Sequence, residues 1–477
     1  MSAAPHGSDE PDTVAMPVAT TGGQPGIFAP GRRVLTSGIV LIITIVAFEA
    51  LAVATILPLV EADLGDLHLY GWVFSAFFLG NLVGIVVAGQ AADRTPLVIP
   101  FAGGVALFAA GLALAATAPS MRVLVLARAL QGLGAGALPA VAYVCIGRAY
   151  PPEQRPRLFA LLSTAWVLPS LVGPAAAGFV GEAIGWRWVF AGLLPLVLAF
   201  GAVVAGTLRR IVTPGGGAVA TVSVRDAVLV AGAGAAVLAG LGAEPWWLAT
   251  SLLFVGLAVG LPAFRRLTPP GTLRLAEGLP AAIGLRGLLT FAFFAADAYV
   301  PFTLATVRGV SPGVAGLALT AAALSWTAGS WIQARQVHRS GPRSLVRVGF
   351  VVLSGATLAF AIVFLPAVPP ALGLPLWGLG GLAMGLAYSP LSLTVLGSAP
   401  RGGEGTATAA LQLADTLGVA LGTGTSGAVI TWATAAGWDR SLGLVLVFAS
   451  AAAVAALGAV LVARLPCRVP LEDAVTG

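Results

Sequence analysis

The residues with the clearest chemical potential are three carboxylates inside long apolar stretches, Glu49, Asp297 and Asp415. A carboxylate at membrane depth is rare and usually lines a water-filled path. Loss of water favours its neutral form, which brings protonation within the physiological range. Two arginines, Arg128 and Arg286, also fall in apolar stretches. This pattern predicts proton binding and release inside a membrane.

Residues that could bind a metal or catalyse a reaction do not cluster in the sequence. The three histidines and two cysteines are far apart in sequence, and no metal-ligand spacing or nucleotide-binding loop is visible. We therefore predict no enzymatic activity, no metal and no cofactor. The formal charge of +6 comes from arginines spread over the loops, so we predict no nucleic-acid partner.

The composition indicates a membrane protein. Hydrophobic residues make up 58% of the 477 positions and charged residues 9%, whereas soluble domains carry roughly 25% charged residues. Most of the surface must therefore face lipid. All 25 basic residues are arginine, and there are 62 glycines, which indicates a GC-rich bacterial genome.

Fourteen segments are apolar enough, at about 20 residues, to cross a bilayer. They span 34–60, 70–92, 97–118, 121–147, 157–181, 187–208, 226–243, 246–264, 280–305, 312–333, 345–366, 373–397, 405–433 and 440–464. With the N-terminus in the cytoplasm, only Arg122, Arg187, Arg308 and Arg440 lie outside, and two arginines lie within helices. The other nineteen of the 25 are cytoplasmic, a strong positive-inside bias. We predict a multi-pass protein of the bacterial inner membrane with both termini cytoplasmic.

The longest polar connections bracket the seventh and eighth segments. In addition, Q-G-L-G from Gln131 in the fourth segment is echoed by W-G-L-G from Trp377 in the twelfth. The plan is thus six helices, an inserted pair and six more. We expect the pair to be peripheral and dispensable. The predicted divisions are a disordered tail at 1–33, a six-helix bundle at 34–208, a linker with two extra helices at 209–279, a second bundle at 280–465 and a tail at 466–477.

Four short motifs point to one family. The loop after the second segment reads G-Q-A-A-D-R-T-P from Gly89, the fourth segment R-A-L-Q-G-L-G from Arg128, and the fifth G-P-A-A-A-G from Gly173. In the first segment, Glu49 precedes Pro58 by nine residues. These motifs resemble those of the major facilitator superfamily, specifically its fourteen-helix drug:proton antiporters. The resemblance implies an all-α fold of two six-helix bundles plus the inserted pair.

The resemblance assigns roles to the loop and to the fifth segment. Gly89, Asp93 and Arg94 would latch the two bundles on the cytoplasmic side, although the family's later glycine and two basic residues are absent. The alternative is a solvated turn. The fifth segment holds Gly173, Pro174 and Gly178, which match the family motif that marks exporters. Small residues permit close helix contact and proline bends the helix, so we expect Gly173 to tolerate only very small replacements; generic packing is the alternative.

The fourth segment matches the family signature most closely, with Arg128, Gln131 and Gly132 in place. From the helical rise, Glu49 and Arg128 differ in depth by only about 5 Å. They can therefore pair if their helices are neighbours, as they are in the family. The alternative is an arginine that extends to the outer surface.

These observations predict a proton-coupled exporter that works by alternating access. Its cargo would be hydrophobic or amphipathic small molecules, cations included, of the multidrug type. Glu49 would be the main proton site, Arg128 would tune it, and Asp297 and Asp415 would contribute from the other bundle. We expect a monomer whose partners are cargo, protons and lipid. The alternatives are an importer or facilitator of the same fold, a lipid exporter, a membrane-embedded enzyme, and a sensor or scaffold.

Overall fold

The structure, a computed structural model, describes residues 27–29, 32–151, 154–209, 223–400 and 403–467, and these contain helices and no β-strand. The helices before the predicted inserted pair are α1 Arg33–Leu64, α2 Tyr70–Arg94, α3 Val98–Ala116, α4 Met121–Ala149, α5 Arg155–Thr164, α6 Val167–Ile184 and α7 Arg187–Leu208. The remaining ones are α8 Val224–Leu241, α9 Trp246–Leu267, α10 Leu279–Asp297, α11 Val300–Phe302, α12 Pro312–Phe360, α13 Gly373–Ser398, α14 Glu404–Ala435 and α15 Arg440–Leu461. Most residues of the predicted tails, and 210–222 of the predicted linker, lie outside the described residues.

Every one of the fourteen predicted segments is helical, and the prediction of an all-α polytopic protein is confirmed. Twelve spans in the described residues are long and apolar enough to cross a membrane. The other two predicted segments are interrupted or less apolar. Segment 157–181 is divided between α5 and α6 by a turn at Ala165 and Trp166, and segment 312–333 carries Ser325, Thr327 and Ser330.

Local sequence explains where several helices begin and bend. The hydroxyls of Ser120 and Ser223 accept hydrogen bonds from backbone amides in the first turns of α4 and α8, which satisfies donors that have no partner within the helix. In the long helix α12, Gly341 has φ 71° and ψ 158°. Glycine adopts this conformation without a steric penalty, so one residue divides α12 into the two predicted segments.

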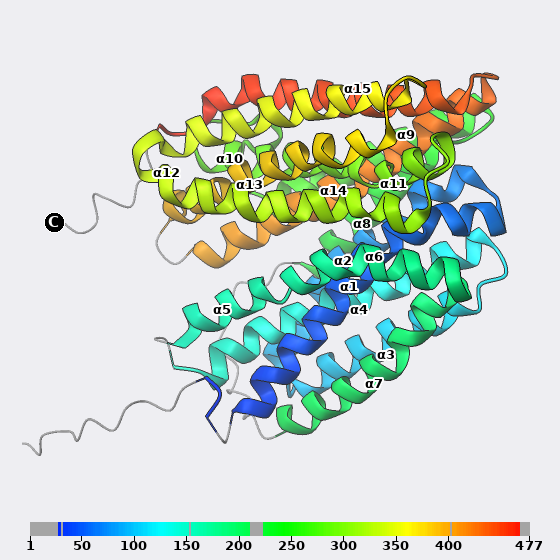
Figure 1. The fold of residues 1–477 in the computed structure, drawn as a ribbon. Coiled ribbons are helices and arrows are strands. Elements are labelled where there is room, and N and C mark those ends of the chain that lie inside the picture. Colours follow the sequence, from blue (N-terminus) through cyan, green and yellow to red (C-terminus); the bar gives the residue numbers. More distant parts are fainter. Residues whose placement is uncertain (1–26, 30–31, 152–153, 210–222, 401–402, 468–477) are drawn as a thin grey trace, which may run out of the picture.

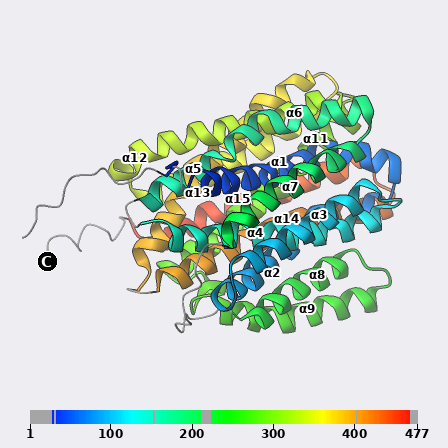
Figure 2. The same cartoon turned by 90° about the horizontal axis from the view of Figure 1, so that it is seen from below.

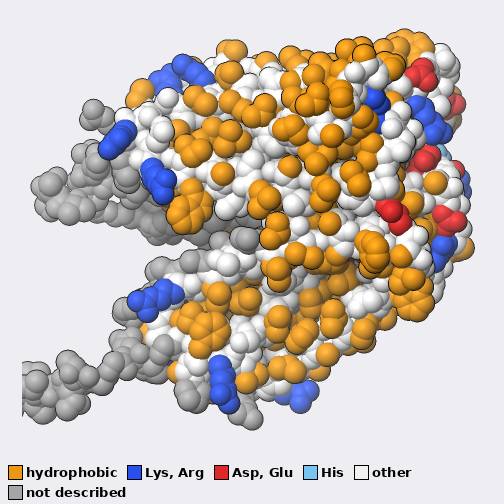
Figure 3. Space-filling model, in the orientation of Figure 1, with side chains coloured by type: hydrophobic (Ala, Val, Ile, Leu, Met, Phe, Trp, Pro, Cys, Tyr) orange, Lys and Arg blue, Asp and Glu red, His pale blue; other side chains and the backbone are white. Residues whose placement is uncertain are grey.

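The helices form two halves that meet at one end (Figure 1). Helices α1–α7 make the first half and α10–α15 the second, and they meet along two seams, α2 with α14 and α6 with α12. We call the end where α1 begins at Arg33 and the chain reaches Arg464 after α15 the tail end, and the opposite end, with residues 65–69 and 308–311, the far end. Figure 3 shows a cleft between the halves that opens at the tail end.

The predicted inserted pair lies on one side of the molecule (Figure 2). Helices α8 and α9 pack together, and α8 contacts both α2 and α14. Helix α9 is outermost and buries only Gly256 and Ala263. The pair is therefore peripheral, as expected, but α8 touches both halves.

Candidate functional site

The first feature of the site is a buried ion pair between Glu49 of α1 and Arg128 of α4. Both side chains are 1% exposed, and Nη1 of Arg128 donates a hydrogen bond to Glu49 Oε1. The same guanidinium donates to the Val73 carbonyl at 3.1 Å and to Gln131 Oε1 at 2.7 Å, and it lies 4.1 Å from the centre of the Phe77 ring. The pairing predicted from helix depth is confirmed, and Arg128 is bound from α1, α2 and its own helix.

Close backbone packing places Arg128 at this depth. A Cβ atom on Gly132 would overlap the Phe77 carbonyl of α2, and one on Gly84 would overlap the Leu133 carbonyl of α4. Helices α2 and α4 are therefore in direct backbone contact along the segment that carries Arg128, as small residues permit in membrane helices. A side chain at Gly132 would therefore push α2 away from the segment that carries Arg128.

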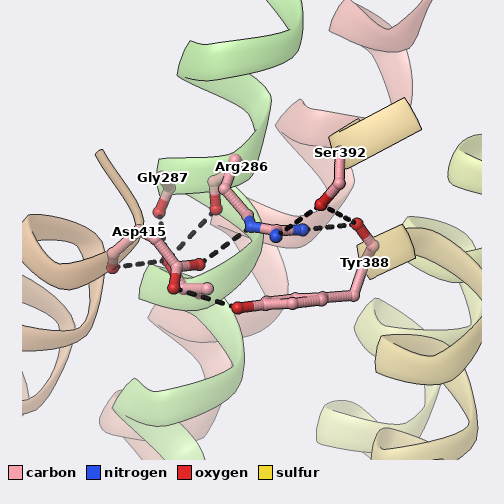
Figure 4. A network of polar contacts seen from close by, with 6 residues as sticks. Arg286, Gly287, Tyr388, Ser392 and Asp415 are labelled. Atoms are coloured by element: carbon pink, nitrogen blue, oxygen red, sulfur yellow. Dashed lines mark hydrogen bonds and ion pairs between the residues drawn. The ribbon is translucent and has the colours of Figure 1, made fainter. Parts of the chain in front are cut away.

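A second ion pair, between a buried arginine and a largely buried aspartate, lies in the other half (Figure 4). Arg286 Nε of α10 is 2.9 Å from Asp415 Oδ1 of α14, and the Tyr388 hydroxyl of α13 donates to Asp415 Oδ2 at 3.1 Å. Arg286 also donates to Ser392 Oγ at 2.9 Å and to the Tyr388 carbonyl, and it lies over the Tyr388 ring. Sequence reasoning identified Asp415 but not this partner, although an arginine within an apolar stretch was a signal for it.

Asp297 has a different environment. It ends α10 and accepts a hydrogen bond from Trp377 Nε1 at 2.7 Å. The Trp377 ring is stacked on Phe293 with centroids 5.3 Å apart. The structure thus separates the three predicted acids into two that pair with arginine and one that contacts an indole.

At the tail end, Asp93 lies 3.4 Å from Arg148 of α4, within the first half. Arg94 is exposed, and a Cβ atom on Gly89 would have no neighbour within 4 Å among the described residues. Because the cleft is open at this end, these three residues do not join the halves in this conformation. Their predicted role as a latch stays a prediction.

At the far end, the seam between α6 and α12 is tight. A Cβ atom on Gly178 would lie 2.5 Å from Gly313 Cα, and one on Gly316 would lie 3.1 Å from the Pro174 carbonyl. Gly173 has more room, because its Cβ would be 3.5 Å from Phe48 Cδ2 of α1. The close contact expected at Gly173 therefore lies one turn further along, at Gly178.

The second far-end seam joins α2 to α14 and carries residues that sequence reasoning missed. Ser75 donates to the Ala420 carbonyl at 2.8 Å, and the Tyr299 hydroxyl donates to the Thr423 carbonyl at 3.4 Å. The Tyr299 ring is 5.1 Å from that of Tyr70. Serine and tyrosine in apolar stretches gave no distinctive signal, since their partners are backbone carbonyls.

Aromatic side chains connect the two halves in the interior. The Phe78 ring of α2 lies 6.3 Å from Phe294 of α10, and Phe294 lies 5.0 Å from Phe293. Trp326 of α12 bridges Phe293 and Tyr388 at 5.7 and 5.3 Å. The second ion pair therefore lies beside a largely apolar, aromatic wall.

Comparison with known proteins matches the chain to one family of membrane transporters. The family model described as Major Facilitator Superfamily matches residues 39–423. The chain is 25% identical over 412 residues to the multidrug transporter protein MdtP of Bacillus subtilis, covering 84% of this chain and 75% of that protein. It is 28% identical over 449 residues to a probable multidrug-efflux transporter of Mycobacterium tuberculosis, covering 88% and 93%.

Solved structures show the same fold. The POT family transporter PepTSo has a TM-score of 0.66 at 14% identity, covering 90% of this chain and 97% of its own. The D-xylose-proton symporter has a TM-score of 0.62 at 15% identity, covering 89% and 97%. These relatives are transporters rather than enzymes, and the family match extends over most of the chain: the protein is a multi-pass membrane transporter of the major facilitator superfamily.

Proposed function

We propose that this chain is a proton-coupled exporter of hydrophobic or amphipathic small molecules, including cations, of the fourteen-helix drug:proton antiporter group. The observation that carries the proposal is the Glu49–Arg128 pair, a protonatable group held out of water beside a single strong partner. The names of the relatives, a multidrug transporter and a probable multidrug-efflux transporter, support the cargo class. We place the tail end in the cytoplasm of a bacterial inner membrane because of the arginine bias.

The pair is suited to exchange a proton. A charged carboxylate at this depth is tolerable only while Arg128 neutralises it. A proton arriving on Glu49 removes that attraction, while Arg128 keeps its hydrogen bonds to the Val73 carbonyl and to Gln131. The arginine is therefore not left without partners, and the link between α1 and α4 is loosened.

Helix α1 can carry this change to the far end. Thr55 lies six residues beyond Glu49, about 9 Å along the helix. Its methyl group would be 2.7 Å from a Cβ atom on Gly316 of α12. Release of α1 from α4 thus acts on the α6–α12 seam, which must part for the cleft to open at the far end. In the second half, Asp415, paired with Arg286, and Asp297 would contribute further protonatable carboxylates.

The test is efflux from proteoliposomes under an imposed pH gradient, with a panel of apolar and amphipathic dyes. We expect Glu49→Gln, which mimics the protonated acid, to bind dye but to lose pH-driven efflux. Glu49→Asp should keep part of the activity, because it restores an acid at the same depth. Wild-type pH-driven efflux by a well-expressed Glu49→Gln protein would contradict this mechanism and move the proton site to Asp297 or Asp415. Dye accumulation driven by the opposite gradient would favour the importer.

A further inference from the structure

The two seams between the halves differ in what covers them on the membrane side. Helix α8 lies directly on the α2–α14 seam. A Cβ atom on Gly234 of α8 would be 3.1 Å from Leu79 Cδ2 of α2 and 3.7 Å from Leu417 Cδ1 of α14. Gly234 of α8 therefore lies against side chains of both halves.

This cover extends along most of α8. Its buried residues Ala227, near the tail end, and Leu238, near the far end, belong to one apolar cluster with residues of both α2 and α14. The hairpin is fixed at the tail end by an ion pair in which Arg266 Nη1 of α9 lies 2.7 Å from Asp226 Oδ1 of α8. Helix α8 therefore covers the α2–α14 seam from near the tail end to near the far end.

The α6–α12 seam lies on the opposite side of the molecule from α8 and α9 (Figure 2). Its tight contacts, at Gly178 with Gly313 and at Pro174 with Gly316, belong to the far end. Figure 3 looks onto this side and shows the cleft open between the halves toward the tail end. Within the described residues, no further helix covers this opening as α8 covers the other.

Large apolar side chains are exposed on the parts of α6 and α12 that border the opening and on the turn before α6. Leu168, near the start of α6, is 62% exposed, and Trp166, in the turn between α5 and α6, is 46% exposed. On the other side, Trp331 of α12 is 64% exposed and carries the Arg335 guanidinium 6.0 Å from its ring centre. Trp331 lies about 22 Å along α12 from the tight contact at Gly316. The exposed side chains of Trp166, Leu168 and Trp331, which we call the apolar rim, therefore lie toward the tail end, with the charged Arg335 beside them.

We propose that the gap between α5–α6 and the tail-end part of α12 is a one-sided entrance for amphipathic molecules dissolved in the adjacent leaflet, and that α8 closes the equivalent gap on the opposite side. This inference rests on the proposed function, since it concerns the route of that cargo. An amphipathic molecule concentrates at the level of such a rim, with its apolar part in the bilayer and its polar end near the interface. It therefore reaches the cleft from the membrane on one side only.

The direct test is photolabelling in proteoliposomes with an alkyl-diazirine derivative of a quaternary ammonium amphiphile, followed by peptide mapping. We expect adducts on peptides with Trp166, Leu168 and Trp331 that excess unlabelled amphiphile removes. Adducts on Phe254 of α9, which is 73% exposed, should not be removed, because they report bulk lipid. Peptides with Leu79 and Leu417 should be labelled several-fold less than the entrance peptides.

A matched pair of variants tests the role of α8. Gly234→Trp should displace α8 from Leu79 and Leu417 and create competable labelling on those peptides. Gly232→Trp on the same helix should not, because a Cβ atom there has no neighbour within 4 Å among the described residues. If Gly234→Trp does not fold, the labelling pattern of the unmodified protein still decides the inference.

The outcomes separate this inference from the proposed function. Competable labelling on Leu79 and Leu417 in the unmodified protein would overturn the one-sided entrance. Efflux driven by pH without competable labelling at either seam would overturn it as well, because the cargo would then enter from water, and would leave the proposed function intact. Competable labelling at the α6–α12 gap without pH-driven efflux in the same vesicles would support the entrance and refute the proton-coupled function.

Discussion

Gly178 of α6 and Gly313 of α12 face each other across the two halves, and a Cβ atom on Gly178 would be 2.5 Å from Gly313 Cα. Such a distance is far below van der Waals contact, so any side chain at Gly178 must separate the helices. The far end of the cleft is therefore closed by backbone contact rather than by interlocking side chains.

We expect Gly178→Leu to abolish efflux by preventing this closure, while expression and membrane insertion persist. The measurement is dye efflux together with the reactivity of a cysteine introduced at the far end, which should rise. Gly192→Leu in α7 is the matched control, because a Cβ atom there has no neighbour within 4 Å among the described residues. Normal coupled efflux by Gly178→Leu would show that the contact is ordinary packing.

The same seam is linked by Glu182 of α6, whose Oε1 accepts a hydrogen bond from the Gly313 amide at 2.6 Å. A carboxylate at a helix N-terminus contributes roughly 0.3–1 kcal/mol. Glu182→Gln should therefore shift the equilibrium toward the far-end-open state by a factor of about 2–5. Spin-label distances across the seam would measure this shift, with Glu244→Gln in the exposed α8–α9 loop as control. An unchanged distance distribution would remove Glu182 from the closure.

The Arg286–Asp415 pair should show strong thermodynamic coupling. Removal of one member of a buried pair leaves an uncompensated charge and costs about 3–5 kcal/mol. We expect Arg286→Gln and Asp415→Asn each to lower thermal stability in detergent, and the double variant to be more stable than the two losses predict together. Tyr388→Phe should cost about 1 kcal/mol, since it loses one hydrogen bond. Additive losses in the double-mutant cycle would show that the pair is not a unit.

Topology can be checked with reporter fusions. The arginine bias places Gly341, in the bend of α12, in the cytoplasm and Asp66, between α1 and α2, outside. The structure has these residues at opposite ends of the helices, so the reporters should give opposite signals. The same signal from both positions would contradict the proposed orientation of the membrane spans.

The sequence by itself determined the class of the protein and one of its ion pairs. Fourteen apolar segments predict the helices because a bilayer sets their minimum length. The pairing of Glu49 with Arg128 could be predicted because the helical rise converts sequence position into depth. The family resemblance implied that their helices are neighbours. The same reasoning gave Asp415 without its partner, because Arg286 lies 129 positions away on a helix whose neighbours are not encoded locally.

Only the tertiary structure decided which helix faces meet. In a membrane helix, the faces toward lipid and toward other helices are both apolar, so the hydrophobic pattern does not distinguish them. For this reason the sequence could not show that Gly178 rather than Gly173 lies in the tight seam, that Asp297 contacts Trp377, or that α8 covers the α2–α14 seam. The opening of the cleft at one end is likewise a property of how the two halves pack along their two seams.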